Sequence, residues 1–312
     1  MKKQSGKFVG EFGEHYREVM RHLYISPLEA CNLACKICYT KKTGERLSNA
    51  QMIDFIDRYG QMVDLQTVTF CGGEVFLLAD FVALVNRVTE KYLVQVITNG
   101  TVDKLEEIRR PNSVNLIVSL DGVPKYHDRN RGKGNWQKSV EFLKKAQRRG
   151  FHTEVFSIVT EENLEKVDEL EMLLKQKLKM DVPVTYHPRK PMTYLKHHPA
   201  SNVVGAVKGF GFINNEERLE LAKTRKIFPP PTLGCYQVSV MSDGKVYGCC
   251  EGIRPLGMME DDVEVLVGKL EERLGEWQKL WSKYPQLLGC VEPGFVCGYK
   301  SDYELENSAR EK

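Results

Sequence analysis

Residues 31–39 read Cys-Asn-Leu-Ala-Cys-Lys-Ile-Cys-Tyr, and this stretch determines how the rest of the chain is interpreted. Its cysteines, Cys31, Cys35 and Cys38, follow one another at spacings of four and three residues in one loop. Thiols at these spacings can reach three corners of a 4Fe-4S cube, whereas such clusters normally take four thiolates. The iron left without a protein ligand would be an open coordination site. From the residues alone, a structural zinc loop and buried thiols without a metal remain as alternatives.

A second motif, Cys71-Gly72-Gly73-Glu74, ends the next predicted strand along the chain. Two glycines let the backbone approach a ligand more closely than residues with a Cβ atom allow, and Glu74 places an anion beside them. On its own, such a turn is weak evidence of a site. Cys71 is predicted to be a small buried side chain rather than a metal ligand.

The three-cysteine spacing followed by an aromatic residue, with the Gly-Gly-Glu turn one βα unit later, resembles the radical S-adenosylmethionine (SAM) enzymes. The resemblance covers roughly residues 22–300. It implies that Cys31, Cys35 and Cys38 bind a 4Fe-4S cluster whose fourth iron chelates the amino and carboxylate groups of SAM. It also implies that the Gly-Gly-Glu turn contacts the amino group of SAM.

Polar residues follow two other predicted strands, at 98–100 (Thr-Asn-Gly) and at 119–122 (Ser-Leu-Asp-Gly). Ordinary turn chemistry would account for both glycines. Residues 121–132 resemble the DG…HD…RG segment of enzymes related to anaerobic sulfatase maturases, in which the arginine matching Arg131 helps to hold SAM. A guanidinium suits the carboxylate of SAM because it is planar and always charged. The resemblance thus implies a SAM-binding set of Gly72, Gly73, Glu74, Asn99, Ser119, Asp121 and Arg131.

Further polar residues complete the rim of this predicted site. Residues 160–163 follow the fifth predicted strand, and residues 187–189 follow the sixth. Asn163 is expected to cap the helix that begins there. For His127, a structural role and a functional role carry equal weight.

Alternating apolar runs and amphipathic segments predict an α/β fold. Ser48 and Gln51 form a capping-box pattern before one of the helices. Six βα units in series favour a parallel sheet with helices outside it, either open or closed into a barrel. The resemblance favours a partial (β/α)6 radical SAM barrel with active groups at the carboxyl ends of its strands. The predicted strands cover residues 22–27, 68–71, 94–98, 116–120, 155–159 and 182–186, and the predicted helices cover 49–63, 81–88, 102–109, 136–149 and 163–178.

A second group of cysteines lies late in the chain. A Ser-Asp-Gly turn between predicted strands at 238–241 and 245–247 forms a hairpin that would bring Cys235 and Cys249 together. The pattern resembles the SPASM or shorter twitch extensions of radical SAM enzymes. It implies one auxiliary Fe-S cluster of the 4Fe-4S type, with a zinc site as the alternative. The implied ligands are Cys235, Cys249, Cys290 and Cys297, and Cys250 stays open as a replacement for Cys290.

These patterns divide the chain into an α/β radical SAM barrel and a small C-terminal SPASM/twitch-like domain. The predicted divisions are an N-terminal extension (1–21), the partial barrel (22–195), a bridging segment (196–234), the auxiliary cluster domain (235–300) and a tail (301–312). The 21 residues before the first strand are too few for a leader-peptide-binding domain. A peptide substrate would therefore need a separate partner or direct docking.

Composition limits the function further. A formal net charge of +3 is too small to favour nucleic acid, and no apolar run approaches the length of about 20 residues that spans a bilayer. Nine cysteines without an export signal indicate reduced metal ligands in the cytoplasm. RNA modification would require a basic stripe or an RNA-binding module, and neither is visible.

The resemblance implies an enzyme that cleaves SAM reductively to a 5′-deoxyadenosyl radical and abstracts a substrate hydrogen atom. The auxiliary cluster would then aid oxidation or cross-linking of a peptide or protein side chain. Electrons would come from an external donor such as a flavodoxin or ferredoxin. The alternatives are dehydrogenation or rearrangement of a small molecule, and a non-catalytic Fe-S electron-transfer or zinc-binding protein.

Overall fold

The structure, a computed structural model, describes residues 10–190, 195, 201–202, 205–227 and 236–283. The chain divides into two compact units, which are treated separately below. Unit 1 takes in residues 1–28, 45–70 and 229–312, and unit 2 takes in residues 29–44 and 71–228.

Unit 1 is built on a sheet that mixes parallel and antiparallel pairing. Strand β1 (His22–Ile25) pairs in parallel with β2 (Thr67–Phe70) on one side and with β8 (Tyr236–Val240) on the other. Strands β8 and β9 (Lys245–Cys249) form an antiparallel hairpin, and β10 (Gly257–Met258) adds to the far edge of β9. The hairpin predicted from the Ser-Asp-Gly turn is therefore confirmed.

The described part of unit 1 has three helices: α1 (Gly10–Met20), α2 (Asn49–Met62) and α9 (Val263–Lys283). The predicted capping box begins α2, since Ser48 Oγ accepts from Gln51 N at 3.3 Å and Gln51 Oε1 accepts from Ser48 N at 3.0 Å. Apolar residues recur about one turn apart, so α2 buries Met52, Phe55, Ile56 and Tyr59 along one face.

Among its described residues, unit 2 has five parallel strands that pair in chain order. They are β3 (Leu93–Thr98), β4 (Val114–Ser119), β5 (His152–Val159), β6 (Val184–Pro188) and β7 (Lys226–Ile227). Helices follow the strands, as a parallel sheet requires. The helices are α3 (Phe81–Val88), α4 (Pro124–Arg131), α5 (Asn135–Arg148), α6 (Val167–Met172) and α8 (Asn215–Thr224).

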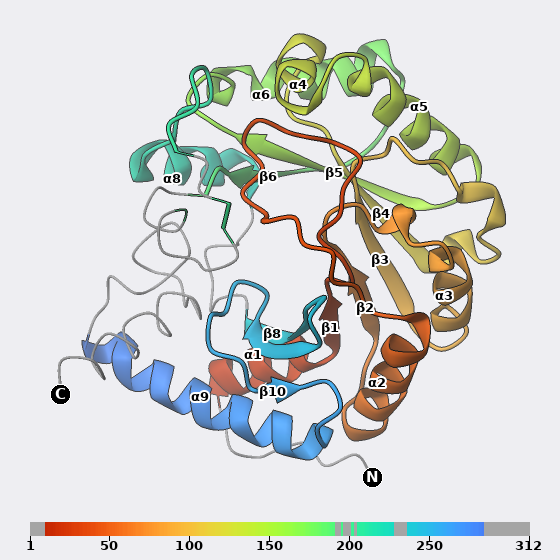
Figure 1. Cartoon of the computed structure of the whole chain (residues 1–312). Helices are drawn as coiled ribbons and strands as arrows, with labels where there is room; N and C mark the ends of the chain where they lie inside the picture. Colours follow the sequence, from red (N-terminus) through yellow and green to blue (C-terminus); the bar gives the residue numbers. More distant parts are fainter. Residues whose placement is uncertain (1–9, 191–194, 196–200, 203–204, 228–235, 284–312) are drawn as a thin grey trace. The chain divides into compact units, whose positions relative to one another are not determined.

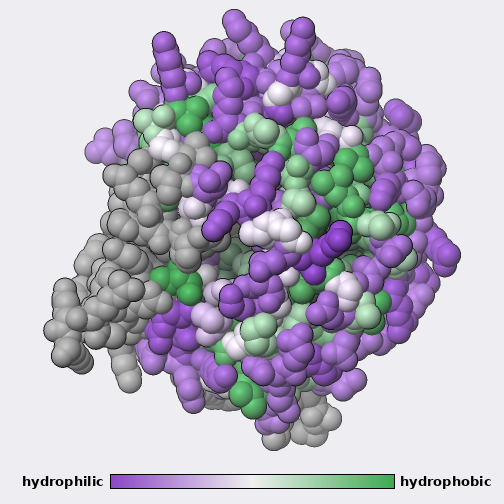
Figure 2. Space-filling model, in the orientation of Figure 1, coloured by the Kyte–Doolittle hydropathy of each residue, from purple (hydrophilic) through white to green (hydrophobic). Residues whose placement is uncertain are grey.

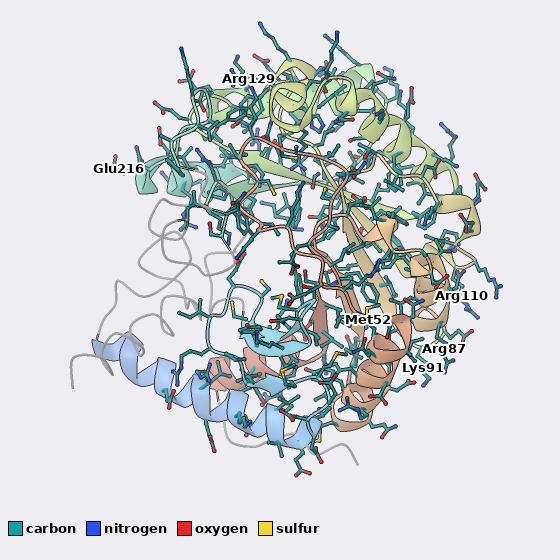
Figure 3. The ribbon with its side chains drawn as sticks, viewed as in Figure 1. Met52, Arg87, Lys91, Arg110, Arg129 and Glu216 are labelled. Atoms are coloured by element: carbon teal, nitrogen blue, oxygen red, sulfur yellow. The ribbon has the colours of Figure 1, made fainter. Side chains whose placement is uncertain are left out.

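The helices of unit 2 lie on the outer side of its strands (Figure 1). Their surface around α4, α5 and α6 is largely hydrophilic (Figure 2). Arg87, Lys91 and Arg110 are exposed and project outward near α3 (Figure 3). These cations therefore belong to a solvated face, and Arg87 pairs there with Glu90 at 2.6 Å. Among the described residues, no helix has the length and apolar character needed to cross a membrane.

Two predicted helices differ from the structure. Over residues 102–109 there is only a short 3-10 turn, Leu105–Glu107. Asp103 Oδ1 accepts the Leu105 N–H at 3.0 Å, which competes with helical hydrogen bonding, and Pro111 stops any continuation. The predicted helix 163–178 is broken into a 3-10 turn, α6 and a π-helical segment, Leu173–Lys177.

The capping box gives a stability prediction. We expect Ser48→Ala to lower the free energy of unfolding by about 1 kcal/mol, because the N–H of Gln51 loses its acceptor. Gln51→Glu is the matched control, since a carboxylate can still accept from Ser48 N. Urea denaturation of both variants measures the effect, and equal midpoints for Ser48→Ala and wild type would contradict it.

Candidate functional site

The site is assembled within unit 2 from the cysteine loop (residues 29–44), the turn after β2, and the ends of β3 and β4. Cys31, Cys35 and Cys38 are each half-buried. The loop turns tightly between the last two, where Cys38 N donates to Cys35 O at 3.2 Å. Burial raises the pKa of the Cys35 thiol to about 11, and the charge of Arg131 opposes this increase.

Glu74 is fully buried, and its carboxylate is engaged by neighbouring groups. It accepts from Thr98 Oγ1 at 2.8 Å, from Asn99 N at 2.8 Å and from Phe76 N at 3.2 Å. Burial raises the pKa of Glu74, because these hydrogen bonds only partly offset the lost solvation. The structure thus places Glu74, a predicted SAM contact, in the buried junction between the Gly-Gly-Glu turn and the end of β3.

The glycines before Glu74 allow the cysteine loop to dock. A Cβ atom on Gly73 would lie 2.1 Å from Ala30 O and 2.4 Å from Glu29 O. The amide of Glu74 donates to Ala30 O at 2.9 Å. Gly72 has a φ of 144°, which favours glycine. From the sequence, these glycines are expected to let the backbone approach a ligand. At Gly73 the close neighbour is instead the backbone of the cysteine loop.

Asn99 faces the same loop from the end of β3. Its amide nitrogen lies 2.9 Å from Asn32 Oδ1 and 3.7 Å from Cys31 Sγ. Ser119, which belongs to the SAM-binding set that the resemblance implies, is half-buried at the end of β4. Cys71 is half-buried as well, not fully buried as predicted.

Asp121 is the second fully buried carboxylate of the site. Arg131 binds it through two hydrogen bonds, Nε to Oδ2 at 2.7 Å and Nη2 to Oδ1 at 3.1 Å. The Ile158 N–H adds a third at 3.1 Å. Burial opposes ionisation of Asp121, but the charge of Arg131 and these hydrogen bonds outweigh it and lower the pKa of the carboxyl. The structure therefore brings two predicted SAM-binding residues together as a buried ion pair.

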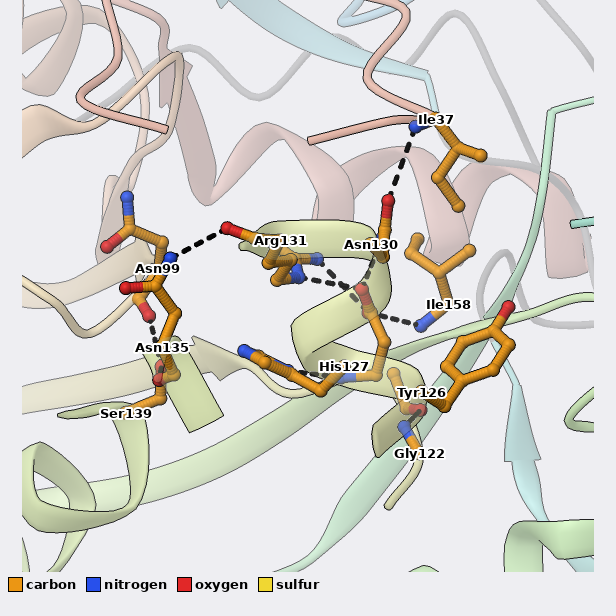
Figure 4. A network of polar contacts seen from close by, with 12 residues as sticks. Ile37, Asn99, Gly122, Tyr126, His127, Asn130, Arg131, Asn135, Ser139 and Ile158 are labelled. Carbon is orange, nitrogen blue, oxygen red and sulfur yellow. Dashed lines mark hydrogen bonds and ion pairs between the residues drawn. The ribbon is translucent and has the colours of Figure 1, made fainter. Parts of the chain in front are cut away.

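Asn130 connects this ion pair to the cysteine loop, and the sequence analysis missed it. Its Nδ2 donates to Asp121 Oδ2 at 2.7 Å, while its Oδ1 accepts from Ile37 N at 3.3 Å (Figure 4). Its backbone oxygen accepts from Lys36 N at 3.0 Å. Asn130 thus binds the backbone between Cys35 and Cys38. The available signal was its position directly before Arg131, in the segment 121–132 that resembles the maturase-type enzymes.

His127 binds the backbone of Asp121. Its Nδ1 accepts from Asp121 N at 3.2 Å, and its ring packs edge-on against Trp136 with centroids 5.7 Å apart. Burial is the main reason that the pKa of His127 falls to about 4. The ring is therefore neutral near pH 7, with its proton on Nε2, which has no hydrogen-bond partner among the described residues. Within this network its role is structural.

Residues 205–212 of the bridging segment pack against the cysteine loop. Phe210 is fully buried beside Ile37 and Tyr126. The Arg129 guanidinium stacks over Phe210 at 4.7 Å and over Tyr126 at 5.2 Å. It also donates to Gly209 O at 2.6 Å. This apolar contact holds the Cys35–Cys38 turn from outside the polar network.

The rim residues have local roles. Asn163 does not cap a helix with its side chain, which corrects the prediction. Its Oδ1 instead accepts from Thr160 N at 2.7 Å, and its Nδ2 donates to Ile158 O at 2.9 Å. His187 Nδ1 lies 2.8 Å from Pro188 O. Asn163 therefore closes the turn that follows β5.

Only some of the predicted auxiliary ligands lie among the residues that the structure describes. Cys249 is fully buried at the end of β9, where it pairs in register with Tyr236, and its sulfur accepts from Glu251 N at 3.4 Å. Cys250 is half-buried. Cys235, Cys290 and Cys297 lie outside the described residues.

The donor set of the cysteine loop suits an iron–sulfur cluster. Three thiols on one loop are the soft ligands that such clusters take, and each would bind a different iron. In the described ranges, no group of three His, Cys, Asp or Glu side chains is gathered as for a single metal ion. The ligands of a cube bind different irons, so they need not converge on one ion. The thiol ligands of this loop and its anchoring on both sides therefore suit a 4Fe-4S cluster.

The chain is similar in sequence to one known protein family and to a protein of known role. Residues 25–174 match the model of the radical SAM superfamily. Over 149 residues the chain is 30% identical to the sporulation killing factor maturation protein SkfB of Bacillus subtilis, covering 45% of this chain and 36% of SkfB. The match thus spans about a third of that relative's length.

Two solved structures share the fold. The structure of anSMEcpe with bound AdoMet has a TM-score of 0.68 at 18% identity, covering 93% of this chain and 99% of that chain. SuiB of Streptococcus suis bound to S-adenosylmethionine has a TM-score of 0.60 at 15% identity, covering 82% and 68%. SuiB is also known bound to the precursor peptide SuiA. The predicted α/β fold with a parallel sheet, of the radical SAM partial-barrel class, is confirmed.

The close approach at Gly73 predicts a loss of cluster binding. We expect Gly73→Ala to displace the cysteine loop, because the new Cβ meets backbone rather than a flexible side chain. Overpacking of this kind costs about 1–3 kcal/mol. Gly44→Ala on the same loop meets nothing within 4 Å and is the matched control. Iron content after anaerobic reconstitution should fall for Gly73→Ala alone, and equal loading of both variants would refute the docking argument.

His127 predicts a pH dependence of stability. Between its ordinary pKa of 6.5 and its folded pKa of about 4, the unfolded chain binds a proton that the folded chain does not. Stability should therefore fall as the pH drops through this window, by about 3 kcal/mol in total from this residue. We expect urea midpoints of His127→Gln to depend less on pH than those of wild type. Exposed His152→Gln is the control, and parallel pH curves for wild type and His127→Gln would contradict the assignment.

Proposed function

Because residues 25–174 match the radical SAM superfamily, we propose that the chain uses SAM to modify a peptide or protein side chain by hydrogen-atom abstraction. In the proposal, Cys31, Cys35 and Cys38 hold a 4Fe-4S cluster with one iron open to SAM. Bound there, the cluster supplies the electron that cleaves SAM to methionine and a 5′-deoxyadenosyl radical. The external electron donor would be a flavodoxin or ferredoxin.

The observation that carries the proposal is the double anchoring of the cysteine loop. On the Cys31 side, the loop lies on Gly73 and is bound by Glu74 N and Asn99. On the other side, Asn130 binds the backbone of Lys36 and Ile37. A loop fixed in this way can present three thiols at constant spacing while the remaining iron stays open. A structural zinc loop would not require that open position.

Arg131 is proposed to bind the carboxylate of SAM. Asp121 occupies its Nε and Nη2. Nη1 takes no part in those two bonds, so one edge of the guanidinium remains for a second carboxylate. The bidentate contact with Asp121 fixes the plane of the guanidinium before SAM binds. Gly72, Gly73, Glu74, Asn99, Ser119 and Asp121 form the remainder of the proposed SAM-binding set.

A peptide substrate is supported by the relatives. SkfB is a maturation protein, and SuiB is known with its precursor peptide. An auxiliary 4Fe-4S cluster on Cys235, Cys249, Cys290 and Cys297 is proposed to accept the electron of the substrate radical. The burial of Cys249 at a strand end in a hairpin suits a ligand position. A small-molecule substrate for the same radical chemistry is the alternative proposal.

The test is iron and sulfide per chain after anaerobic reconstitution, in wild type and in a Cys31→Ala/Cys35→Ala/Cys38→Ala variant. We expect about eight irons falling to about four. Reduced wild type given SAM should form 5′-deoxyadenosine, and the variant should form none. About four irons falling to zero would withdraw the auxiliary cluster and leave the late cysteines to zinc or structure. Loaded wild type that forms no 5′-deoxyadenosine would overturn the enzymatic proposal.

A further inference from the structure

The sulfur of Cys31 lies among several polar groups. Leu33 N donates to Cys31 Sγ at 3.4 Å, and Asn99 Nδ2 lies 3.7 Å from the same atom. The thiol itself faces Asn32 Oδ1 at 3.9 Å. A cysteine must lose its proton to bind iron, so the sulfur then acts as an acceptor only. Leu33 N and Asn99 Nδ2 are the donors that remain.

The side-chain amide of Asn99 is held in one orientation. Its Oδ1 accepts from Thr101 N at 2.8 Å and from Thr101 Oγ1 at 2.6 Å. An amide NH2 group cannot accept these hydrogen bonds, so the nitrogen must be the atom that faces the cysteine loop.

Asn32 closes this arrangement into a ring. Asn32 Nδ2 donates to Thr101 Oγ1 at 2.8 Å, and Asn32 Oδ1 accepts from Asn99 Nδ2 at 2.9 Å. One N–H of Asn99 is therefore used by Asn32, and the second is directed to the sulfur.

The backbone of Asn99 is fixed as firmly as its side chain. Its N–H donates to the buried carboxylate of Glu74 at 2.8 Å. Its carbonyl accepts from Ser139 Oγ at 2.7 Å (Figure 4). The residue is 6% exposed. A donor held in this way loses little entropy when it binds the sulfur, and water cannot easily replace it.

From this geometry we infer that Asn99 is a positioning residue that donates an N–H···S hydrogen bond to the Cys31 thiolate and raises the reduction potential of the cluster. The inference rests on the proposed function, because it requires a cluster on Cys31. Reduction adds one electron from a donor such as dithionite and makes or breaks no bond in the protein. The added negative charge strengthens the hydrogen bond, so the reduced state gains more from it than the oxidised state.

The test is a redox titration of the reconstituted protein with dithionite, without SAM, followed by electron paramagnetic resonance. Subtracting the signal of the triple cysteine variant isolates the cluster on Cys31. We expect the ratio of reduced to oxidised cluster at fixed potential to fall about three- to tenfold in Asn99→Ala. A tenfold fall corresponds to 59 mV for one electron. The exchangeable proton coupling from the amide should also disappear.

Two further variants keep the inference testable. Asn99→Asp retains an acceptor for Thr101 but replaces the donor with an anionic oxygen, so its potential should fall at least as far. Thr101→Val leaves the donor in place and removes the hydroxyl that orients it, so the shift should be smaller in the same direction. Asn86→Ala is the matched control, since it too removes an asparagine side chain with its hydrogen bonds, in this case two bonds to backbone, and its potential should equal that of wild type.

The outcomes separate this inference from the proposed function. A wild-type chain that binds no iron would overturn both. A loaded chain whose SAM-free potential is the same in wild type, Asn99→Ala and Asn99→Asp would overturn this inference alone. Weaker SAM binding at unchanged SAM-free potential would also overturn it, and would assign Asn99 to SAM rather than to the sulfur.

Discussion

The burial of two carboxylates, Glu74 and Asp121, is the constraint on which the rest of the site depends. Neither is exposed, and burial of an uncompensated carboxylate costs several kcal/mol. Asp121 is compensated by Arg131 and by amide donors, and Glu74 by one hydroxyl and two backbone amides. Loss of any one donor would leave part of the carboxylate without a hydrogen-bond partner, which makes displacement of any of these groups costly.

Each carboxylate reaches the cysteine loop through an asparagine. Glu74 fixes the backbone of Asn99, and Asp121 fixes the side chain of Asn130. Asparagine suits this role because its amide both donates and accepts. Asn130 donates to Asp121 and accepts from the backbone of Ile37, whereas Asn99 accepts from Thr101 and donates toward Cys31. Through these two asparagines, the buried carboxyl groups restrain both ends of the three-cysteine segment.

The sequence was sufficient for the six strands predicted before residue 190 and for the C-terminal hairpin, because strand periodicity and turn chemistry are local signals. It missed the two-residue strands β7 and β10, which are too short to show a period. It could not show that Glu74 and Arg131 would be bound by Thr98 and Asp121, since those contacts form only when separate strand ends meet. Asn130 was missed for the same reason. The prediction of a helix over residues 102–109 was wrong because the Asp103 side chain binds the Leu105 amide. A pattern of apolar residues gives no sign of such a contact.

Charge around the thiols links metal binding to the order of the loop. Burial holds the Cys35 thiol protonated by raising its pKa, and the negative charge of Asp121 acts in the same direction. Arg131 opposes them, yet its charge is largely neutralised by Asp121, so it cannot by itself make the thiolate stable. In the proposed enzyme, iron would therefore have to supply the energy that deprotonates this cysteine. The amides of Asn99 and Asn130 are neutral, and they hold the loop through hydrogen bonds whose partners do not depend on the charge of Cys35.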